Sequence, residues 1–274
     1  MKFSVLNGKF IKTKKTTISM LDKGYWFDFC VYSSLKVIQG EPYFLDYHVE
    51  RIFDSAERIE LKHGFSKTEI SDWVKKLIKK NKTKDCLLRL VLIGDPDLEK
   101  KGAKLYILPI TGLTYHKNQD YSEGIKVITY SGQRAVPEAK TKSLLLGFLA
   151  FRQAKKEGAT EALMIDNDGF VREGTQTNFF AIKGDKLIIP PQTKCLEGIT
   201  KKFILEAVKD EFQITEEDIP LDKIKMGDYD EFFISSTTRN VMPIRQIDDY
   251  QVKSIDQCKK ISKLLKKYQD KRIT

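Results

Sequence analysis

The sequence has no long apolar run and is poor in metal-binding residue types, with four cysteines and three histidines among 274 residues. A membrane-spanning helix needs about 18 or more consecutive apolar residues, so we expect no membrane partner. Asn7-Gly8 interrupts the first apolar residues before a secretory signal could form. The sequence therefore predicts a cytoplasmic protein.

The cysteines lie far apart, at Cys30, Cys86, Cys195 and Cys258, and none forms a C-x-x-C pair. Zinc sites and disulfide frameworks need cysteines at closer or more regular spacing. We therefore expect buried, reduced thiols and no bound metal ion. The sequences G-x-G-x-x-G and Walker A are also absent, so neither nucleotide-binding motif is present.

Basic residues exceed acidic ones, 48 to 38, which gives a formal net charge of +10. The lysines gather in residues 75–84 and 259–271, where Leu and Ile interleave with them at helical spacing. This pattern is typical of the solvated face of an amphipathic helix. No nucleic-acid-binding module is recognisable, so we expect no nucleic-acid partner.

A hydrophobic content of 41% indicates a folded globular chain, and its length favours two domains. The first half alternates strand and helix patterns, including a capping box at Ser66-Lys67-Thr68-Glu69. The expected strands are 9–12, 31–38, 42–45, 87–93 and 104–110, and the expected helices cover 48–61 and the residues after Ser66.

The polar stretch from Gly112 to Gly124 is typical of a linker. We predict a first α+β domain over residues 1–115, a linker over 116–123 and a second α+β domain over 124–274. The second domain mixes hairpins with helices instead of repeating strand–helix–strand units. Its expected strands are 126–130, 161–166, 178–182, 186–189 and 231–235, and its expected helices are 142–157, 200–212 and 255–268.

Four segments of the second half concentrate residues suited to chemistry. They are EAKTKSLL (138–145), VREGTQTNFF (171–180), LEGIT (196–200) and ISSTTRNVMPI (234–244). In this order they resemble the class IV aminotransferase family, with a weaker match over residues 22–51. The resemblance implies a two-domain α+β fold of type IV, like that of D-amino acid aminotransferase. It also implies pyridoxal 5′-phosphate (PLP) as cofactor, and a homodimer.

The resemblance implies that Lys140 bonds to the PLP aldehyde and then acts as general base, because a sheltered lysine amine can lose its proton. Lys142 is a nearby competitor, but the Leu-rich helix that follows and Gly158 fit Lys140 better. The second segment looks like the family's E-G-x-x-x-N-x-F signature. Glu173 would there hold a proton on the pyridine nitrogen, which makes the ring a better electron sink.

The resemblance further implies a phosphate site made of separate pieces. Ile199 and Thr200 begin a helix, where exposed amides and a hydroxyl bind anions. Ser236 and Thr237 would complete the site from a hydroxyl-rich turn. The sequence HVER, ending at Arg51, resembles the family's H-x-x-R, whose arginine reaches the phosphate because guanidinium donors match phosphate oxygens in pairs.

The substrate would meet Tyr32, Thr238 and Arg89 in this interpretation, with Tyr32 and Ser33 joining Lys140 as catalytic residues. Ser33 stands where many aminotransferases carry a glutamate, and its hydroxyl resembles the aminodeoxychorismate lyase branch. Arg89 lies in a strand that instead resembles the branched-chain aminotransferases. The two markers point to different branches.

Other differences leave three functions open. Asp28-Phe29-Cys30 stands where the family commonly reads G-D-G, and residues 96–103 lack the arginine and histidine of D-amino acid aminotransferases. The leading hypothesis is transfer of an amino group from an amino acid to a 2-oxo acid. The first alternative is an aminodeoxychorismate lyase that releases 4-aminobenzoate and pyruvate. The second is a non-catalytic binding protein on the same scaffold.

Overall fold

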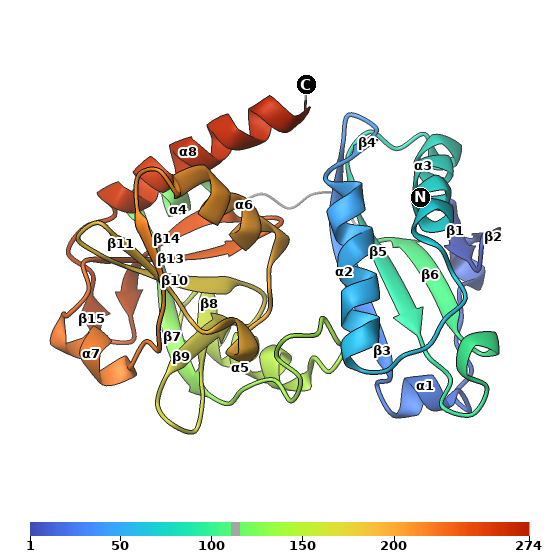
Figure 1. Cartoon of the computed structure of the whole chain (residues 1–274), viewed down its shortest axis with the longest axis horizontal. Helices are drawn as coiled ribbons and strands as arrows, with labels where there is room; N and C mark the ends of the chain where they lie inside the picture. Colours follow the sequence, from blue (N-terminus) through green and yellow to red (C-terminus); the bar gives the residue numbers. More distant parts are fainter. Residues whose placement is uncertain (111–115, 274) are drawn as a thin grey trace. The chain divides into compact units, whose positions relative to one another are not determined.

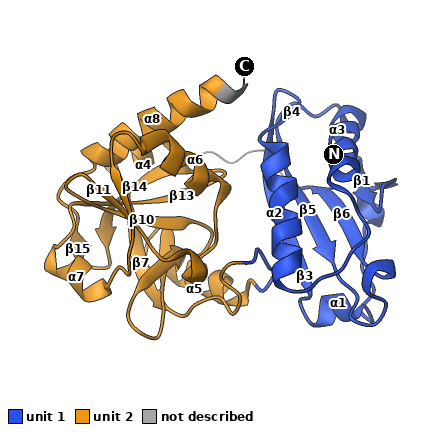
Figure 2. Ribbon diagram, viewed as in Figure 1, with its two compact units in different colours: residues 1–114, 139–143 blue, residues 115–138, 144–274 orange. Residues whose placement is uncertain are grey.

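The computed structural model describes residues 1–110 and 116–273, and the chain divides into two compact units. Unit 1 comprises Met1–Thr114 with Ala139–Ser143, and unit 2 comprises Tyr115–Glu138 with Leu144–Thr274 (Figure 2). Each unit combines a β-sheet with helices, which confirms the α+β class.

Unit 1 is built on a six-stranded antiparallel sheet with the order β2-β1-β6-β5-β3-β4 (Figure 1). Its strands are β1 (Phe3–Leu6), β2 (Lys9–Lys12), β3 (Cys30–Ile38), β4 (Glu41–Pro42), β5 (Cys86–Ile93) and β6 (Lys104–Pro109). Its helices are α1 (Lys23–Trp26), α2 (Leu45–Arg58) and α3 (Lys67–Asn81).

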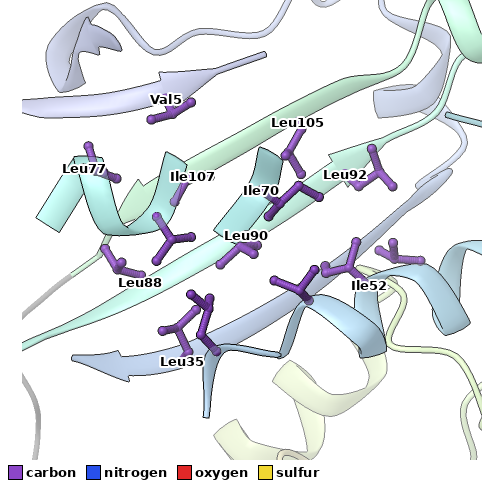
Figure 3. Close-up of a cluster of buried hydrophobic side chains, with 14 of the residues drawn as sticks. Val5, Leu35, Ile52, Ile70, Leu77, Leu88, Leu90, Leu92, Leu105 and Ile107 are labelled. Carbon is purple, nitrogen blue, oxygen red and sulfur yellow. The ribbon is translucent and has the colours of Figure 1, made fainter. Parts of the chain in front are cut away.

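The core of unit 1 lies between its sheet and helices α2 and α3. Leu35 of β3 and Leu90 of β5 pack in one cluster with Ile52 of α2 and Ile70 of α3 (Figure 3). Burying such a side chain contributes roughly 1.5–3 kcal/mol. The core therefore fixes which face of β3 each side chain occupies.

The sequence predicted the start of α3 correctly but not the start of α2. The capping box of α3 is confirmed, because Glu69 N donates to Ser66 Oγ and Ser66 N donates to the Glu69 carboxylate. The predicted strand at 42–45 is wrong beyond Pro42. Phe44 adopts a left-handed conformation, with φ 53°, which turns the chain into α2 at Leu45.

Unit 2 contains a nine-stranded sheet with the order β12-β11-β10-β13-β14-β7-β8-β9, and β15 pairs with β14. The strands are β7 (Ile125–Ser131), β8 (Glu161–Ile165), β9 (Val171–Gly174), β10 (Asn178–Lys183), β11 (Lys186–Ile189), β12 (Gln213–Glu216), β13 (Glu231–Ser236), β14 (Asn240–Ile247) and β15 (Tyr250–Gln251). An additional pairing of β9 with β10 closes six of these strands into a ring.

The helices of unit 2 are α4 (Asn118–Glu123), α5 (Leu145–Lys156), α6 (Ile199–Val208), α7 (Leu221–Met226) and α8 (Asp256–Ile273). Helix α4 lies within the predicted linker, and residues 111–115 of the predicted first domain lie outside the described residues. Phe179 and Phe232 stack in the core, with ring centroids 5.8 Å apart.

The four cysteines are buried, as predicted. Over residues 1–110 and 116–273, every helix is too short or too polar to cross a bilayer.

Candidate active site

The segment around Lys140 is bonded to the first residues of β3. Tyr32 N donates to the Lys140 carbonyl at 2.9 Å, and Lys142 N donates to the Cys30 carbonyl at 3.1 Å. Lys140 N donates to Ser55 Oγ on α2 at 3.0 Å. By these contacts Lys140 lies in unit 1, whereas the sequence pattern groups it with the second domain. Helix α5 begins only after this extended segment.

The Lys140 amine lies against the aromatic ring of Tyr32. Its Nζ is 5.1 Å from the ring centroid, and the guanidinium carbon of Arg89 is 5.3 Å from the same centroid. Burial by itself would raise the pKa of the Tyr32 phenol, but the positive charges of Lys140, Arg89 and Arg51 lower it below its ordinary value. The structure thus brings three of the predicted site residues together around one ring.

Ser33 lies on the opposite face of β3 from Tyr32, because successive side chains of a strand alternate. Tyr32 packs in a cluster with Cys30, whereas Ser33 shares its face with Leu35 and the core beneath α2. The Ser33 side chain is fully buried. The geometry therefore directs the Ser33 hydroxyl away from the Lys140 amine.

Ser33 instead takes part in a buried network with two residues of α2. Arg51 Nη2 donates to Ser33 Oγ at 2.7 Å, and Ser33 Oγ lies 2.9 Å from His48 Nδ1. Arginine only donates, and Arg51 Nη2 also lies 3.5 Å from His48 Nδ1, which favours Nδ1 as an acceptor. Ser33 then donates to Nδ1, and the neutral His48 ring carries its proton on Nε2.

Arg51 is the residue of this network that is open to a further ligand. Its Nε is buried without a hydrogen-bond partner, and in the described part of the chain its guanidinium contacts Ser33 and His48, neither of which is acidic. Burial lowers the pKa of Arg51 to about 10, so it remains cationic at neutral pH. A buried cation that lacks a carboxylate is suited to an anionic ligand.

The burial of His48 leads to a prediction about pH. Burial, followed by the positive charge of Arg51, holds the pKa of His48 well below its ordinary value of 6.5. Below that pH the unfolded chain takes up a proton that the folded chain does not. Stability should therefore fall on acidification, by up to about 1.4 kcal/mol per pH unit for this group.

Thermal unfolding between pH 8 and 5 measures this effect. His63 and His116 also have lowered pKa values, so the contribution of His48 is the difference between wild type and His48→Asn. The asparagine amide oxygen can replace Nδ1 as acceptor for Ser33 but does not titrate. Identical pH profiles for the two proteins would contradict a neutral, buried His48.

In unit 2, Glu173 is held by Arg134. Arg134 Nε donates to Glu173 Oε1 at 2.6 Å, and the backbone N of Leu196 donates to Oε2 at 3.3 Å. The Glu173 side chain is only 9% exposed. An arginine at this distance forms a charge-assisted hydrogen bond, and the carboxylate oxygens can still accept from a ligand.

The spacing between Glu173 and Asn178 follows from the ring of strands. The two residues face each other where β9 pairs with β10. Glu173 accepts from Leu196 N, and Asn178 Nδ2 donates to Leu196 O at 2.6 Å. A Cβ at Gly198 would lie 1.9 Å from Asn178 Oδ1, so only glycine fits. The two residues therefore position the segment that leads into α6.

Helix α6 and the turn after β13 present free polar groups. Gly198 caps α6 without a side-chain hydrogen bond, which leaves the first amides, at Ile199 and Thr200, open to an anion. The turn residues Ser236, Thr237 and Thr238 are partly exposed, and Ser236 Oγ lies 3.5 Å from Thr238 Oγ1. The preceding Ser235 Oγ is buried without a partner.

Sequence reasoning missed two functional contacts of this region. Arg134 precedes Lys140 by six residues and carries no motif of its own, so nothing in a single sequence indicates that it pairs with Glu173. Arg239 stands within the fourth family segment, but the motif predicts no partner for it. It donates to Glu161 and to His116, contacts that join residues far apart in the chain.

The sequence of this chain is similar to a known protein family and to several of its members. The model of the family "Amino-transferase class IV" matches residues 30–247. A branched-chain-amino-acid aminotransferase of Pseudomonas aeruginosa is 28% identical over 90% of this chain and 85% of its own. An aminodeoxychorismate lyase of Bacillus subtilis is 28% identical over 89% of this chain and 86% of its own.

Solved structures share the fold. The branched-chain aminotransferase of T.th., solved with pyridoxamine 5′-phosphate, superposes with a TM-score of 0.86 at 22% identity. The match covers 97% of this chain and 93% of that one. This likeness confirms the type IV fold that was expected from the sequence.

Proposed function

Because this chain belongs to the class IV aminotransferase family, we propose that it uses PLP to transfer an amino group from an amino acid to a 2-oxo acid. The observation that carries the proposal is the amine of Lys140, which lies against Tyr32 on a segment bonded to β3. A half-buried lysine next to an aromatic ring is suited to form a covalent bond with an aldehyde.

The free polar groups of the two units fit the chemistry of PLP. In unit 1, Arg51 offers a buried cation with an unpartnered Nε. In unit 2, the uncapped start of α6 at Ile199 and Thr200, and the hydroxyls of Ser236 and Thr237, would bind phosphate oxygens. When bound, PLP supplies an aldehyde for the amino group and a ring that stabilises negative charge at the α-carbon.

The chain's own residues would move and hold the protons. Lys140 Nζ would take the proton from the α-carbon of the amino acid and return it at the next step. Tyr32 would orient that amine. Glu173, held in place by Arg134, would hold a proton on the ring nitrogen. The contacts of each residue within its own unit support these roles.

Substrate binding would depend on Arg89 and Thr238. The Arg89 guanidinium lies beside Tyr32, and its Nε donates to Ser34 Oγ at 3.2 Å. Its remaining donors suit the carboxylate that amino acids and 2-oxo acids share. Thr238 would offer a hydroxyl from the turn after β13.

A donor and acceptor screen tests the proposal. Purified protein loaded with PLP is mixed with L- and D-amino acids, branched-chain ones first, and the colour change of the bound cofactor is followed. We expect amino-group transfer to a 2-oxo acid. Its absence with every pair, in a protein that holds PLP, would refute the transferase assignment.

The similarity to an aminodeoxychorismate lyase supports a second candidate function. Incubation with aminodeoxychorismate would then yield 4-aminobenzoate and pyruvate without amino-group exchange. A PLP-loaded protein inert in both assays would favour a non-catalytic binding protein. A cytoplasmic location and the absence of nucleic-acid and membrane partners remain predictions.

We also propose a homodimer, supported by an exposed apolar stripe on α5. Leu145, Phe148 and Leu149 are 70%, 56% and 41% exposed and follow one another at helical spacing. A contiguous apolar face of this kind marks an interaction site more often than free surface. Sedimentation at micromolar concentration should therefore give twice the mass of the chain.

Substitution within the stripe should split the dimer. We expect Leu145→Glu with Phe148→Glu to sediment as a folded monomer, because each charge would be buried at the interface. Lys183→Glu changes an exposed charge at the end of β10, outside α5, and should leave the dimer intact. A wild-type monomer, or a dimer that survives the double substitution, would contradict this interface.

A further inference from the structure

The carboxylate of Glu161 is the centre of a buried polar network in unit 2. Glu161 begins β8 and is fully buried. Its Oε1 accepts from the hydroxyl of Thr175 and from two backbone amides, Ala162 N at 3.1 Å and Thr175 N at 3.3 Å. Its Oε2 accepts from Arg239 Nη1. Every oxygen of this carboxylate is therefore engaged.

These partners belong to two different turns. Thr175 follows Glu173-Gly174 in the turn between β9 and β10. Arg239 lies in the turn between β13 and β14, where its N donates to the Ser236 carbonyl at 3.2 Å. The Glu161 carboxylate therefore connects, by hydrogen bonds, the turn next to Glu173 with the turn that follows Ser236.

The side chains of Glu161 and Arg239 have little room to move. A Cβ at Gly174 would lie 2.1 Å from Thr177 Oγ1 and 3.2 Å from Glu161 Cγ, so only glycine fits beside this network. Arg239 is only 7% exposed, and its Nε donates to His116 Nε2 at 3.1 Å. The guanidinium is therefore held from two sides, by Glu161 and by His116.

We propose that Glu161 and Arg239 are positioning residues for the cofactor phosphate: the ion pair holds the hydroxyls of Ser236 and Thr237 in place relative to Glu173. This inference rests on the proposed function, because it assumes that the phosphate of PLP meets this turn. A buried ion pair adds little net stability compared with well-packed apolar residues. Its location between the two turns is better explained by the geometry that it fixes.

Titration of the apoprotein with PLP, and separately with pyridoxal, which lacks the phosphate, tests the inference. The absorbance of the lysine-linked cofactor reports binding in both series. In Arg239→Met we expect the affinity for PLP to fall about tenfold or more, as for the loss of a charge-assisted hydrogen bond. The affinity for pyridoxal should change less than about twofold, since Lys140 and Glu173 do not meet a phosphate.

The matched control is Arg245→Met, which removes an exposed arginine from β14, the strand that follows Arg239. It should bind both compounds like wild type. Arg239→Lys keeps the charge beside Glu161 but cannot also reach His116, so it should lose PLP affinity selectively, by a smaller factor. If Arg239→Met does not fold, this conservative variant decides the question by the same comparison.

The outcomes separate the two proposals. A wild-type protein that binds no PLP overturns both the proposed function and this inference. If wild type binds PLP and the Arg239 variants bind PLP equally well, only the positioning role is overturned. An equal loss of PLP and pyridoxal affinity has the same meaning, because it would show general damage to the unit.

Discussion

Lys140→Ala is expected to remove the covalently bound cofactor and to lower the rate of amino transfer by about 10²–10⁴-fold or more, because both the nucleophile and the general base are lost. The backbone bonds that fix this segment to β3 and to Ser55 do not depend on the side chain, so the variant should fold. Visible absorbance of the loaded protein measures the loss, and borohydride reduction with mass spectrometry locates the adduct.

The neighbouring lysine is a matched control. Lys142 lies two residues further along the same segment, with its amine 5.8 Å from the ring centroid of Tyr25 and not at Tyr32. Lys142→Ala should therefore keep the adduct and the rate within about twofold, a change that corresponds to less than half a kcal/mol. A reduced adduct on Lys142, or on no lysine, would refute the assignment of Lys140.

Arg51→Met is expected to weaken PLP binding by roughly 10- to 150-fold, since hydrogen bonds to charged groups contribute about 1.5–3 kcal/mol. Arg51 has a buried Nε without a partner, and a charged ligand would satisfy it. Fluorescence or absorbance titration of the apoprotein gives the affinity. Arg58→Met, at the exposed end of the same helix, should bind PLP like wild type.

A variant of Ser33 tests whether its hydroxyl supports PLP binding through Arg51 or acts on the substrate. Because Ser33 accepts from Arg51, Ser33→Ala should weaken PLP binding about two- to tenfold, less than the loss of Arg51 itself, because the cation stays in place. The ratio of transferase to lyase products should not change. If Ser33→Ala instead alters that ratio at unchanged PLP affinity, the hydroxyl acts on the substrate, and a Ser33 side chain directed away from Lys140 is contradicted.

Local features were the most predictable from the sequence. The capping box at Ser66 and Glu69 and the apolar spacing of residues 48–61 depend on neighbours within one helix, and α3 and α2 formed close to the expected bounds. The family motifs located Lys140 and Glu173 in the chain. Local chemistry determines such features, so a single sequence contains them.

Long-range pairings could not be predicted in the same way. No strand was predicted at β14. Pro243 cannot donate to a sheet ladder, which argues against a strand, yet Pro243 pairs with Phe233 of β13. The placement of Lys140 with unit 1 depends on backbone bonds to β3, more than a hundred residues earlier in the chain. Nothing in the sequence around Lys140 encodes that partner.

The alternation of Tyr32 and Ser33 across β3 limits how this enzyme can diversify. Deleting one residue upstream would turn the phenol into the apolar interior and the hydroxyl toward the amine, because the side-chain period of a strand is two. The eight residue pairs that β3 shares with β5 oppose such a slip. New substrate preferences should therefore arise by exchange of side chains at constant strand length, with insertions confined to the hairpin at Gln39-Gly40.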